Sequence, residues 1–274
     1  MINKELKSLH QWLSVNRLSL NIGKTNFVIF HPYNKPVKEF ITIKINKKAI
    51  KEEKYVKYLG ILIDSTLSFN FHIDNICKKI SRAIGVMYKI RYYVNSSILK
   101  NLYYALIYPH ILYGIQVWGS TFNYLTNRIM VLQKKCIRMM TFNDGNFVRD
   151  GPRAHTAPLF KLLNILPLAK VYMLRICLFV FECIKDESPL FKCWFTLNSA
   201  LHNHNTRSNS NSQLENYTIM NSNNIFIPYT RTSYGKKSVK LEGSRLWNNI
   251  PQEIRGMRSF KVSAGLSPRG SKII

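Results

Sequence analysis

The sequence predicts an α+β protein in which a small β-rich N-terminal part precedes a mostly α-helical body and a partly disordered tail. Three observations indicate this class. β-branched and aromatic residues cluster before residue 66, apolar residues recur at intervals of three and four after it, and asparagine is frequent beyond residue 198. With 46% hydrophobic residues, the 274-residue chain can bury a substantial core.

The first predicted element is an amphipathic helix that ends near Asn16. Its apolar residues recur every three or four positions and therefore share one helical face: Ile2, Leu6, Leu9 and Leu13. Three strands are predicted next. The stretch 25–30 is rich in β-branched and aromatic residues, and the stretch 40–45 alternates apolar and polar residues. The third stretch, 58–63, contains Gly60, where another backbone can approach closely.

The clearest helix is predicted from residue 71 to about residue 94. Its apolar residues form one stripe, which comprises Ile73, Ile76, Cys77, Ile80, Ile84 and Met87. The opposite side carries Lys78, Arg82 and Lys89, which fall within a narrow arc at about 100° per residue. We call these three residues the cationic ridge. The pattern predicts a helix that packs on a core with one face and presents charge on the other.

The rest of the chain alternates further helices with polar connections. Ser96 and Ser97 are candidate caps for a helix that Pro109 kinks or restarts. The following elements are an amphipathic helix over 124–140, a loop over 143–157 and proline-opened helices over 158–163 and 167–185. Nine asparagines between 198 and 224 predict a linker or disordered segment, and 262–274 show no period. The predicted parts are therefore 1–66, 67–195, 196–224 and 225–274.

The charge balance indicates a polyanionic partner. Forty Lys and Arg against fourteen Asp and Glu leave a net charge of +26, which is spread along the whole chain. Such an excess favours nucleic acid as the partner. The alternatives are a cationic surface that serves only solubility, and attraction to anionic lipid.

The cysteine and hydropathy patterns predict an intracellular protein of the nucleus or cytoplasm, without a membrane partner. The five cysteines are odd in number and contain no C-x-x-C pair, unlike a disulfide framework. The polar start predicts no signal peptide. The longest apolar runs, 103–118 and 171–184, are too short and too interrupted for a bilayer span.

Two ordered motifs carry a family resemblance. The first has the form N-x-x-K-T-x-x-x-x-F and consists of Asn21, Lys24, Thr25 and Phe30; the second is Tyr58-Leu59-Gly60. This pair resembles the end of the palm domain in reverse transcriptases of jockey-like, non-LTR retrotransposons. The resemblance extends to about residue 261 through further motifs at 69–73, 108–114, 117–119, 132–135, 204–208, 232–238 and 246–248.

The resemblance implies a fold and roles for particular residues. Residues 1–66 would be a small antiparallel palm remnant, and 67–195 would be a thumb-like helical domain. Lys24 would lie near the phosphates of the incoming nucleotide, as electrostatic stabiliser or proton donor to the leaving group. Tyr58 to Gly60 would form the primer grip. The endonuclease, the fingers and the aspartate-bearing palm have no counterpart in this sequence.

The chain lacks the clustered carboxylates that hold the two Mg²⁺ ions of a polymerase. No Tyr-x-Asp-Asp sequence occurs. Glu52 and Glu53 stand among lysines, which favours charge balance in a turn, and Asp64 is more typical of a turn cap after a strand than of a metal ligand. We therefore expect no metal or other cofactor in this fragment, whereas the complete enzyme would use Mg²⁺.

Other aromatic and metal-binding residue types have a plainer interpretation. The tyrosines of the segment 103–113 could stack on bases, but their spacing among Leu and Ile favours half-buried core residues. His110 follows a kinking proline, which favours a hydrogen-bonded core histidine over a general base. Cys193, His202 and His204 do not fit a closed four-ligand zinc site.

Residues and resemblance together predict a C-terminal fragment of an RNA-directed DNA polymerase that keeps template-binding and primer-binding surfaces. The cationic ridge would neutralise phosphates of RNA or an RNA–DNA hybrid. The palm and fingers of a full-length polymerase would be the protein partner, and the fragment alone would be inactive. The alternatives are a non-catalytic nucleic-acid-binding or scaffold protein derived from such an element, and a decayed reading frame without a cellular role.

Overall fold

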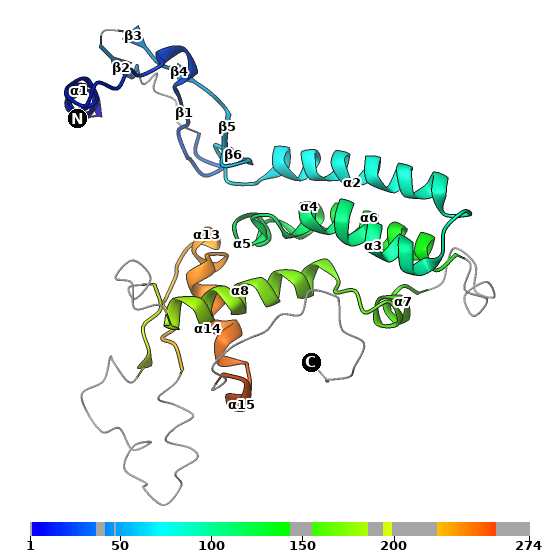
Figure 1. Cartoon of the computed structure of the whole chain (residues 1–274). Coiled ribbons are helices and arrows are strands. Elements are labelled where there is room, and N and C mark those ends of the chain that lie inside the picture. The colour runs from blue at the N-terminus through cyan, green and yellow to red at the C-terminus, as the bar shows by residue number, and fades with distance from the viewer. Residues whose placement is uncertain are drawn as a thin grey trace, which may run out of the picture. The chain divides into compact units, whose positions relative to one another are not determined.

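The computed structural model describes residues 2–36, 42–46, 48–142, 155–185, 194–198 and 224–255 (Figure 1). The described chain is mostly helical, and its few short strands precede residue 66, as the sequence predicts. Two compact units are present: Met1–Arg82 with Thr121–Ile129, and Ala83–Ser120 with Met130–Ile274. The four predicted parts and their palm and thumb assignment stay predictions.

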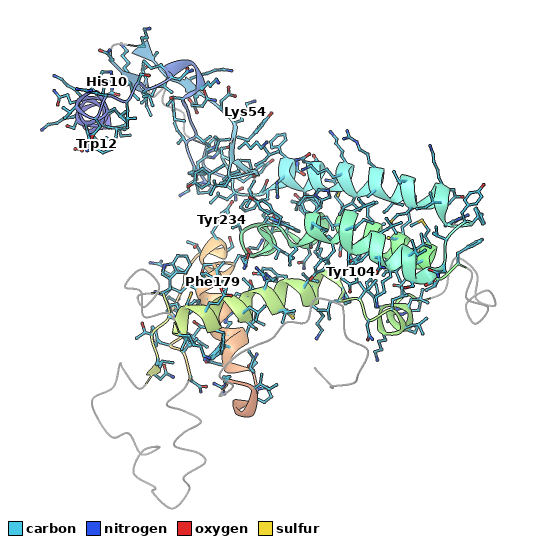
Figure 2. The ribbon with its side chains drawn as sticks, viewed as in Figure 1. His10, Trp12, Lys54, Tyr104, Phe179 and Tyr234 are labelled. Atoms are coloured by element: carbon cyan, nitrogen blue, oxygen red, sulfur yellow. The ribbon has the colours of Figure 1, made fainter. Side chains whose placement is uncertain are left out.

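Helix α1, Ile2–Val15, forms as its apolar spacing predicts. It adjoins a small core in which three isoleucines are buried and three apolar residues are partly buried: Ile43, Ile45, Ile50, Leu6, Leu20 and Phe27. The Asn3 side chain joins the helix to the next segment, because its Oδ1 accepts a hydrogen bond from the Lys44 amide at 3.0 Å. No residue of α1 is itself buried, and Trp12 is 58% exposed (Figure 2).

The described strands form three separate two-stranded pairs. The pairs are β1 (Asn26–Phe27) with β4 (Lys51–Glu52), β2 (Lys44–Ile45) with β3 (Lys48–Ala49), and β5 (Tyr55–Tyr58) with β6 (Ile61–Asp64). The last two pairs are antiparallel, whereas β1 and β4 run parallel. An entirely antiparallel arrangement is therefore wrong, because the long connection between β1 and β4 lets the chain cross back in the same direction.

The predicted single strand over 58–63 is also wrong. Tyr58 pairs with Ile61 across a two-residue turn, which makes β5 and β6 a hairpin. Leu59 and Gly60 both have positive φ, at 45° and 86°. A type I′ turn requires this backbone at both central positions, and glycine adopts it without steric cost. Gly60 thus serves the turn rather than a close approach within a strand.

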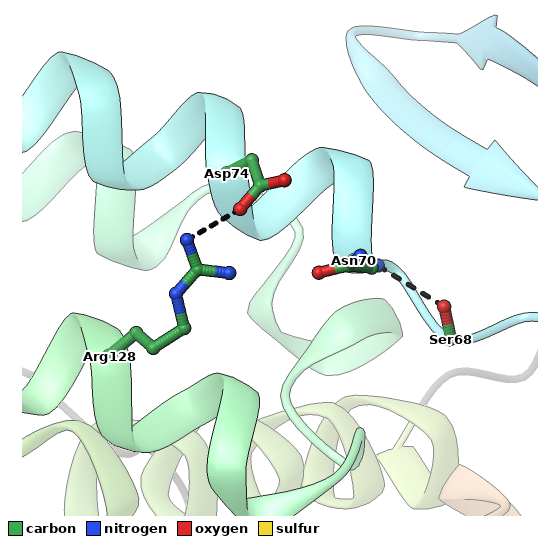
Figure 3. A network of polar contacts seen from close by, with 4 residues as sticks. All are labelled: Ser68, Asn70, Asp74 and Arg128. Carbon is green, nitrogen blue, oxygen red and sulfur yellow. Dashed lines mark hydrogen bonds and ion pairs between the residues drawn. The ribbon is translucent and has the colours of Figure 1, made fainter.

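Helix α2, Asn70–Ile90, confirms the predicted amphipathic helix and ends about four residues earlier than expected. Its apolar stripe is buried except for Cys77, which is half-buried. Within the first unit, two polar contacts connect this segment to 121–129. Thr121 Oγ1 donates a 2.6 Å hydrogen bond to the Ser68 carbonyl. Arg128 pairs with Asp74 at 2.6 Å, as Figure 3 shows.

The remaining helices form the second unit together with the end of α2. They are α3 (Ser96–Leu106), α4 (Tyr108–Leu112), α5 (Ile115–Trp118), α6 (Asn123–Met140, from its third turn on), α7 (Ala157–Leu162), α8 (Leu168–Lys185), α13 (Ser233–Lys236), α14 (Val239–Asn248) and α15 (Gln252–Arg255).

Pro109 lies in the first turn of α4, which confirms that the helix restarts at this proline. The prediction that Ser96 or Ser97 caps α3 is wrong, because the capping residue is Asn95. Its side-chain oxygen accepts a hydrogen bond from the Ile98 amide at 2.9 Å, and this amide, in the first turn, has no partner within the helix.

A buried glutamine organises the centre of the second unit. Gln133 has no exposed surface. Its Nε2 donates to the Tyr103 hydroxyl at 2.8 Å and to the Leu166 carbonyl at 2.9 Å, while its Oε1 accepts from the Leu168 amide at 2.9 Å. One side chain therefore forms hydrogen bonds with polar groups of α3, of the loop before α8 and of the start of α8.

Helices α8 and α14 also pack closely within the second unit (Figure 1). Gly243 permits this approach, because a Cβ there would lie 2.8 Å from Val180 Cγ2. Tyr172 of α8 donates a 2.6 Å hydrogen bond to Glu242 of α14. Asn248 bonds both the amide and the carbonyl of Ile225, each at 2.9 Å. The segment that precedes α13 is thus tied to the end of α14.

Several sequence predictions fall on residues outside those described, including most of the loop 143–157, the tract 199–223 and the end 262–274. Cys193 and the histidines 202 and 204 also lie there. The cysteines at 77, 136, 177 and 183 are free thiols. Burial raises the pKa of the Cys136 thiol to about 12. Among the described helices, none is both long and apolar enough to cross a membrane.

Candidate nucleic-acid interface

The cationic ridge lies on the exposed side of α2, opposite the buried stripe. Lys78, Arg82 and Lys89 are all exposed. They span about 16 Å of helix axis at about 1.5 Å per residue. The sole acid within α2 is Asp74, which pairs with Arg128. Among the described residues no salt bridge involves a ridge cation, so the three positive charges are available to a polyanion.

The Arg128–Asp74 pair has a structural role (Figure 3). The two side chains are 46% and 36% exposed, and a pair with that much solvent contact contributes at most about 1 kcal/mol. It also neutralises the one carboxylate of α2. The ridge therefore faces no competing acid on its own helix.

Lys24 is exposed at the end of a one-turn 3₁₀ helix, η1 (Ile22–Lys24). Thr25 of the same motif donates its Oγ1 proton to the Asn21 carbonyl at 2.9 Å, which closes the turn. A hollow of about 560 Å³ adjoins this turn, lined by Leu20, Asn21, Ile22, Gly23, Thr25, Asn26, Lys48, Ala49 and Lys51. Hydrogen bonding and the charge of Glu53 raise the pKa of Lys51, which pairs with that acid at 2.7 Å. Lys24 itself is not among the residues that line this hollow, whose two lysines are Lys48 and Lys51.

The predicted primer-grip residues lie at the tip of the β5–β6 hairpin. Tyr58 and Leu59 are 64% and 73% exposed, and Gly60 is exposed. The parallel β1–β4 pair brings residues 26–27, shortly after Lys24, beside residues 51–52, shortly before β5. Both motifs therefore belong to the first unit and flank one strand pair. The structure describes no direct contact between Lys24 and the hairpin tip.

Asp64 caps the turn after β6, as the sequence predicts. Its carboxylate accepts hydrogen bonds from Thr66 Oγ1 at 2.7 Å, from the amide and hydroxyl of Ser68 at 3.0 and 2.9 Å, and from the Phe69 amide at 2.6 Å. Burial alone would raise the pKa of Asp64, but these hydrogen bonds together lower it. Its lone pairs are thus committed to the turn. In the described parts of the chain, no group of three or more His, Cys, Asp or Glu side chains could hold a metal ion.

The tyrosines of α3 and α4 are core residues rather than an open stacking surface. Tyr103 is fully buried, its hydroxyl bonds Gln133, and burial raises its pKa. Tyr104 and Tyr108 are half-buried, with ring centroids 5.3 Å apart. Tyr113 differs, since it is 56% exposed. His110 is half-buried in the same segment. The prediction of half-buried core residues is confirmed for Tyr104 and Tyr108, Tyr103 is buried more deeply than predicted, and the prediction is wrong for Tyr113.

An aromatic–arginine cluster at the end of α2 was not predicted. Arg91 lies over the rings of Tyr88, Tyr92 and Phe142, with its guanidinium carbon 3.9, 4.6 and 4.3 Å from the ring centroids. The spacing of Tyr88, Arg91 and Tyr92 is that of helix neighbours and could have indicated part of it. Phe142 follows α6, fifty residues later, and no local pattern connects it to α2.

Sequence comparison finds similar proteins among the RNA-directed DNA polymerases of mobile elements. The chain is 27% identical to the RNA-directed DNA polymerase from mobile element jockey of Drosophila funebris, over 51% of this chain and 15% of that protein. It is 25% and 30% identical to the probable RNA-directed DNA polymerases from transposon X-element and transposon BS of Drosophila melanogaster, over 48% and 36% of this chain and 14% and 11% of those proteins. No protein-family model and no solved structure matches the chain.

The chain is thus similar in sequence to RNA-directed DNA polymerases of the non-LTR retrotransposons jockey, X-element and BS. This similarity confirms the resemblance that the two N-terminal motifs indicate. The chain spans only about a seventh or less of the length of these curated relatives.

Proposed function

We propose that this chain works as a C-terminal part of a retrotransposon RNA-directed DNA polymerase and holds the template–primer hybrid through the cationic ridge of α2. The observation that carries the proposal is the ridge itself: three exposed cations in a narrow arc, on a helix whose other face is anchored in the core. The relatives are polymerases that copy RNA into DNA, so the matching polyanion is an RNA–DNA hybrid.

The expected contact is one of shape and charge. The major groove of an A-form-like duplex is too deep and narrow for side chains to read, whereas its phosphates remain accessible. Lys78, Arg82 and Lys89 would each neutralise one backbone phosphate and release its counterion. Binding would then depend strongly on salt and little on sequence.

Two further roles belong to the same proposal. Lys24, exposed at the end of η1, would stabilise the phosphates of an incoming nucleotide, or protonate the leaving group, once the complete polymerase is assembled. The Tyr58–Leu59–Gly60 turn would contact the primer strand, because its side chains are exposed and its backbone is held by the I′ geometry.

The ridge is tested by the triple change Lys78→Ala, Arg82→Ala and Lys89→Ala. It should weaken binding of a fluorescent RNA–DNA hybrid for every sequence alike, and it should flatten the plot of log affinity against log salt by about 2 to 3. The matched control replaces three exposed lysines of other helices, Lys161, Lys170 and Lys240, which removes the same charge. Equal effects of the two triple variants would show that only net charge matters and would overturn the proposal.

The purified chain should extend no primer on a primed RNA template with deoxynucleotides and Mg²⁺, because its described residues contain no carboxylate cluster to hold the metal pair. The assay needs a control with an active reverse transcriptase under the same conditions. Mg²⁺-dependent synthesis that survives repurification and is lost in Lys24→Ala would show that the chain is itself a polymerase.

A further inference from the structure

The aromatic–arginine cluster at the end of α2 consists of Tyr88, Arg91, Tyr92 and Phe142, all within the second unit. Its parts hold one another in place. Arg91 donates a hydrogen bond to the Tyr92 hydroxyl, and the rings of Tyr92 and Phe142 meet edge to face, with centroids 5.8 Å apart and an interplanar angle of 89°. One cation therefore groups three rings around a single positive charge.

The three rings nevertheless remain open to solvent. Tyr88, Tyr92 and Phe142 are 52%, 61% and 49% exposed, whereas Arg91 is half-buried among them. The guanidinium contacts one side of each ring and leaves the remainder accessible. Tyr93, the next residue along, is 87% exposed. A fixed group of half-exposed rings around a positive charge is unlike a core, where the apolar surface is covered.

We infer that this cluster is a stacking platform for the unpaired bases of a single RNA strand. The inference rests on the proposed function, in which the template is RNA and continues as a single strand beyond the hybrid. Every base has a π-face that stacks on an aromatic ring, and a guanidinium adds a cation–π contact and attracts phosphate.

Charge complementarity favours RNA over a protein partner. The centre of the cluster is a cation, Lys89 of the ridge stands two residues before it, and the chain carries a net charge of +26. An apolar protein surface would leave the partly buried guanidinium without a counter-charge on burial. RNA offers flat rings and anions together, which match the two chemical groups of the cluster.

The test uses the full chain and a single-stranded oligouridine RNA that carries one 2-aminopurine. The double change Tyr88→Leu and Tyr92→Leu keeps apolar packing and net charge but removes both π-faces. It should weaken single-strand binding about tenfold or more and reduce the quenching of 2-aminopurine, with Phe142 as the one ring of the cluster that remains. The slope of affinity against salt should not change, since no charge is removed. The control is Tyr229→Leu, a tyrosine that is 89% exposed elsewhere in the second unit.

Three outcomes would overturn the inference: a double variant that binds the single strand as tightly as the unchanged chain, a loss equal to that of Tyr229→Leu, or displacement of the RNA by poly-glutamate at equal charge concentration. The proposed function fails separately. If the ridge variant binds the hybrid normally while the double leucine variant loses single-strand binding, the platform stands and the ridge does not.

Discussion

In the helical region from α3 to α8 the side chains of Tyr103, Ile111 and Gln133 have no exposed surface, whereas helix α1 contains no buried residue at all. The strands near α1 pair only two at a time, and isolated two-stranded pairs are marginally stable in water. The small core beside α1 contains three buried isoleucines. Each region is amphipathic in sequence, but only the helical one converts that pattern into a deep core.

The comparison shows where the folding free energy of the described chain resides. Burial of apolar surface is its dominant source, so the helices supply most of it. The motif residues Lys24 and Tyr58 belong to the thinly packed region, where few buried contacts oppose local opening. Any ligand that binds there would oppose such opening.

The largest expected effect comes from Gln133→Leu. This change leaves the Leu166 carbonyl and the Leu168 amide buried without their partner and removes the bond to Tyr103. We expect a loss of about 3 kcal/mol or more in the free energy of unfolding, since each unsatisfied buried group costs about 1 to 3 kcal/mol. Urea unfolding followed by circular dichroism measures it.

Gln11→Leu on the exposed part of α1 is the matched control and should change the free energy of unfolding by less than about 0.5 kcal/mol. Equal losses in the two variants would show that the helical region is no better packed than the N-terminal one.

A smaller effect is expected from pH. Burial, together with the charge of Lys79, lowers the pKa of His72 to about 4. In the neutral ring, Nδ1 accepts a 3.4 Å hydrogen bond from the Leu62 amide. In the unfolded chain the histidine side chain becomes protonated near pH 6.5. The neutral His72 side chain therefore stabilises the fold fully above about pH 6.5, and this stabilisation is lost as the pH falls toward 4.

His72→Gln should remove this part of the pH dependence in thermal unfolding between pH 7 and pH 4. His155→Gln, at an exposed histidine, is the control and should keep it. Below about pH 4 both variants should still lose stability, because hydrogen bonds lower the pKa of Asp64 and that carboxylate becomes protonated only there. An unchanged pH profile in His72→Gln would contradict the assignment.

The smallest effect is expected at Trp12. It is 58% exposed on α1, so Trp12→Gln should shift the free energy of unfolding by less than about 0.5 kcal/mol. Leu6→Gln, on the face of α1 that adjoins the small isoleucine core, should cost about 1 to 2 kcal/mol. If Trp12→Gln were the more damaging of the two, the exposed face of α1 would be a packing surface, and the contrast between the two regions would disappear.

The sequence predicted the helices well because their signals are local. Ile73, Ile80 and Met87 recur at helical spacing and all are buried. The strands were predicted less well. The turn at Leu59–Gly60 depends on positive φ at a leucine, which residue type does not reveal, and the β1–β4 pairing joins segments far apart in the chain.

The candidate site was predictable to the same extent. The exposure of the cationic ridge followed from helical periodicity, and the role of Asp64 followed from its place after a strand. Gln133 and Phe142 were missed because their partners come from other helices. The assignment of Lys24 and Tyr58 to nucleotide and primer rests on family resemblance and stays a prediction.

Contacts around Asn248 and Ile225 connect the parts of the chain that lie before and after the stretch 199–223. It bonds the Ile225 backbone through both of its polar atoms, Leu197 pairs with Ile225, and α14 packs along α8. The Leu197–Ile225 pair and the α8–α14 packing are noncovalent, and both join residues before the stretch 199–223 to residues after it. A peptide-bond break within that stretch would leave them all in place. Two pieces divided there would be held together by these noncovalent contacts alone, without the covalent connection that keeps them close to each other in one chain.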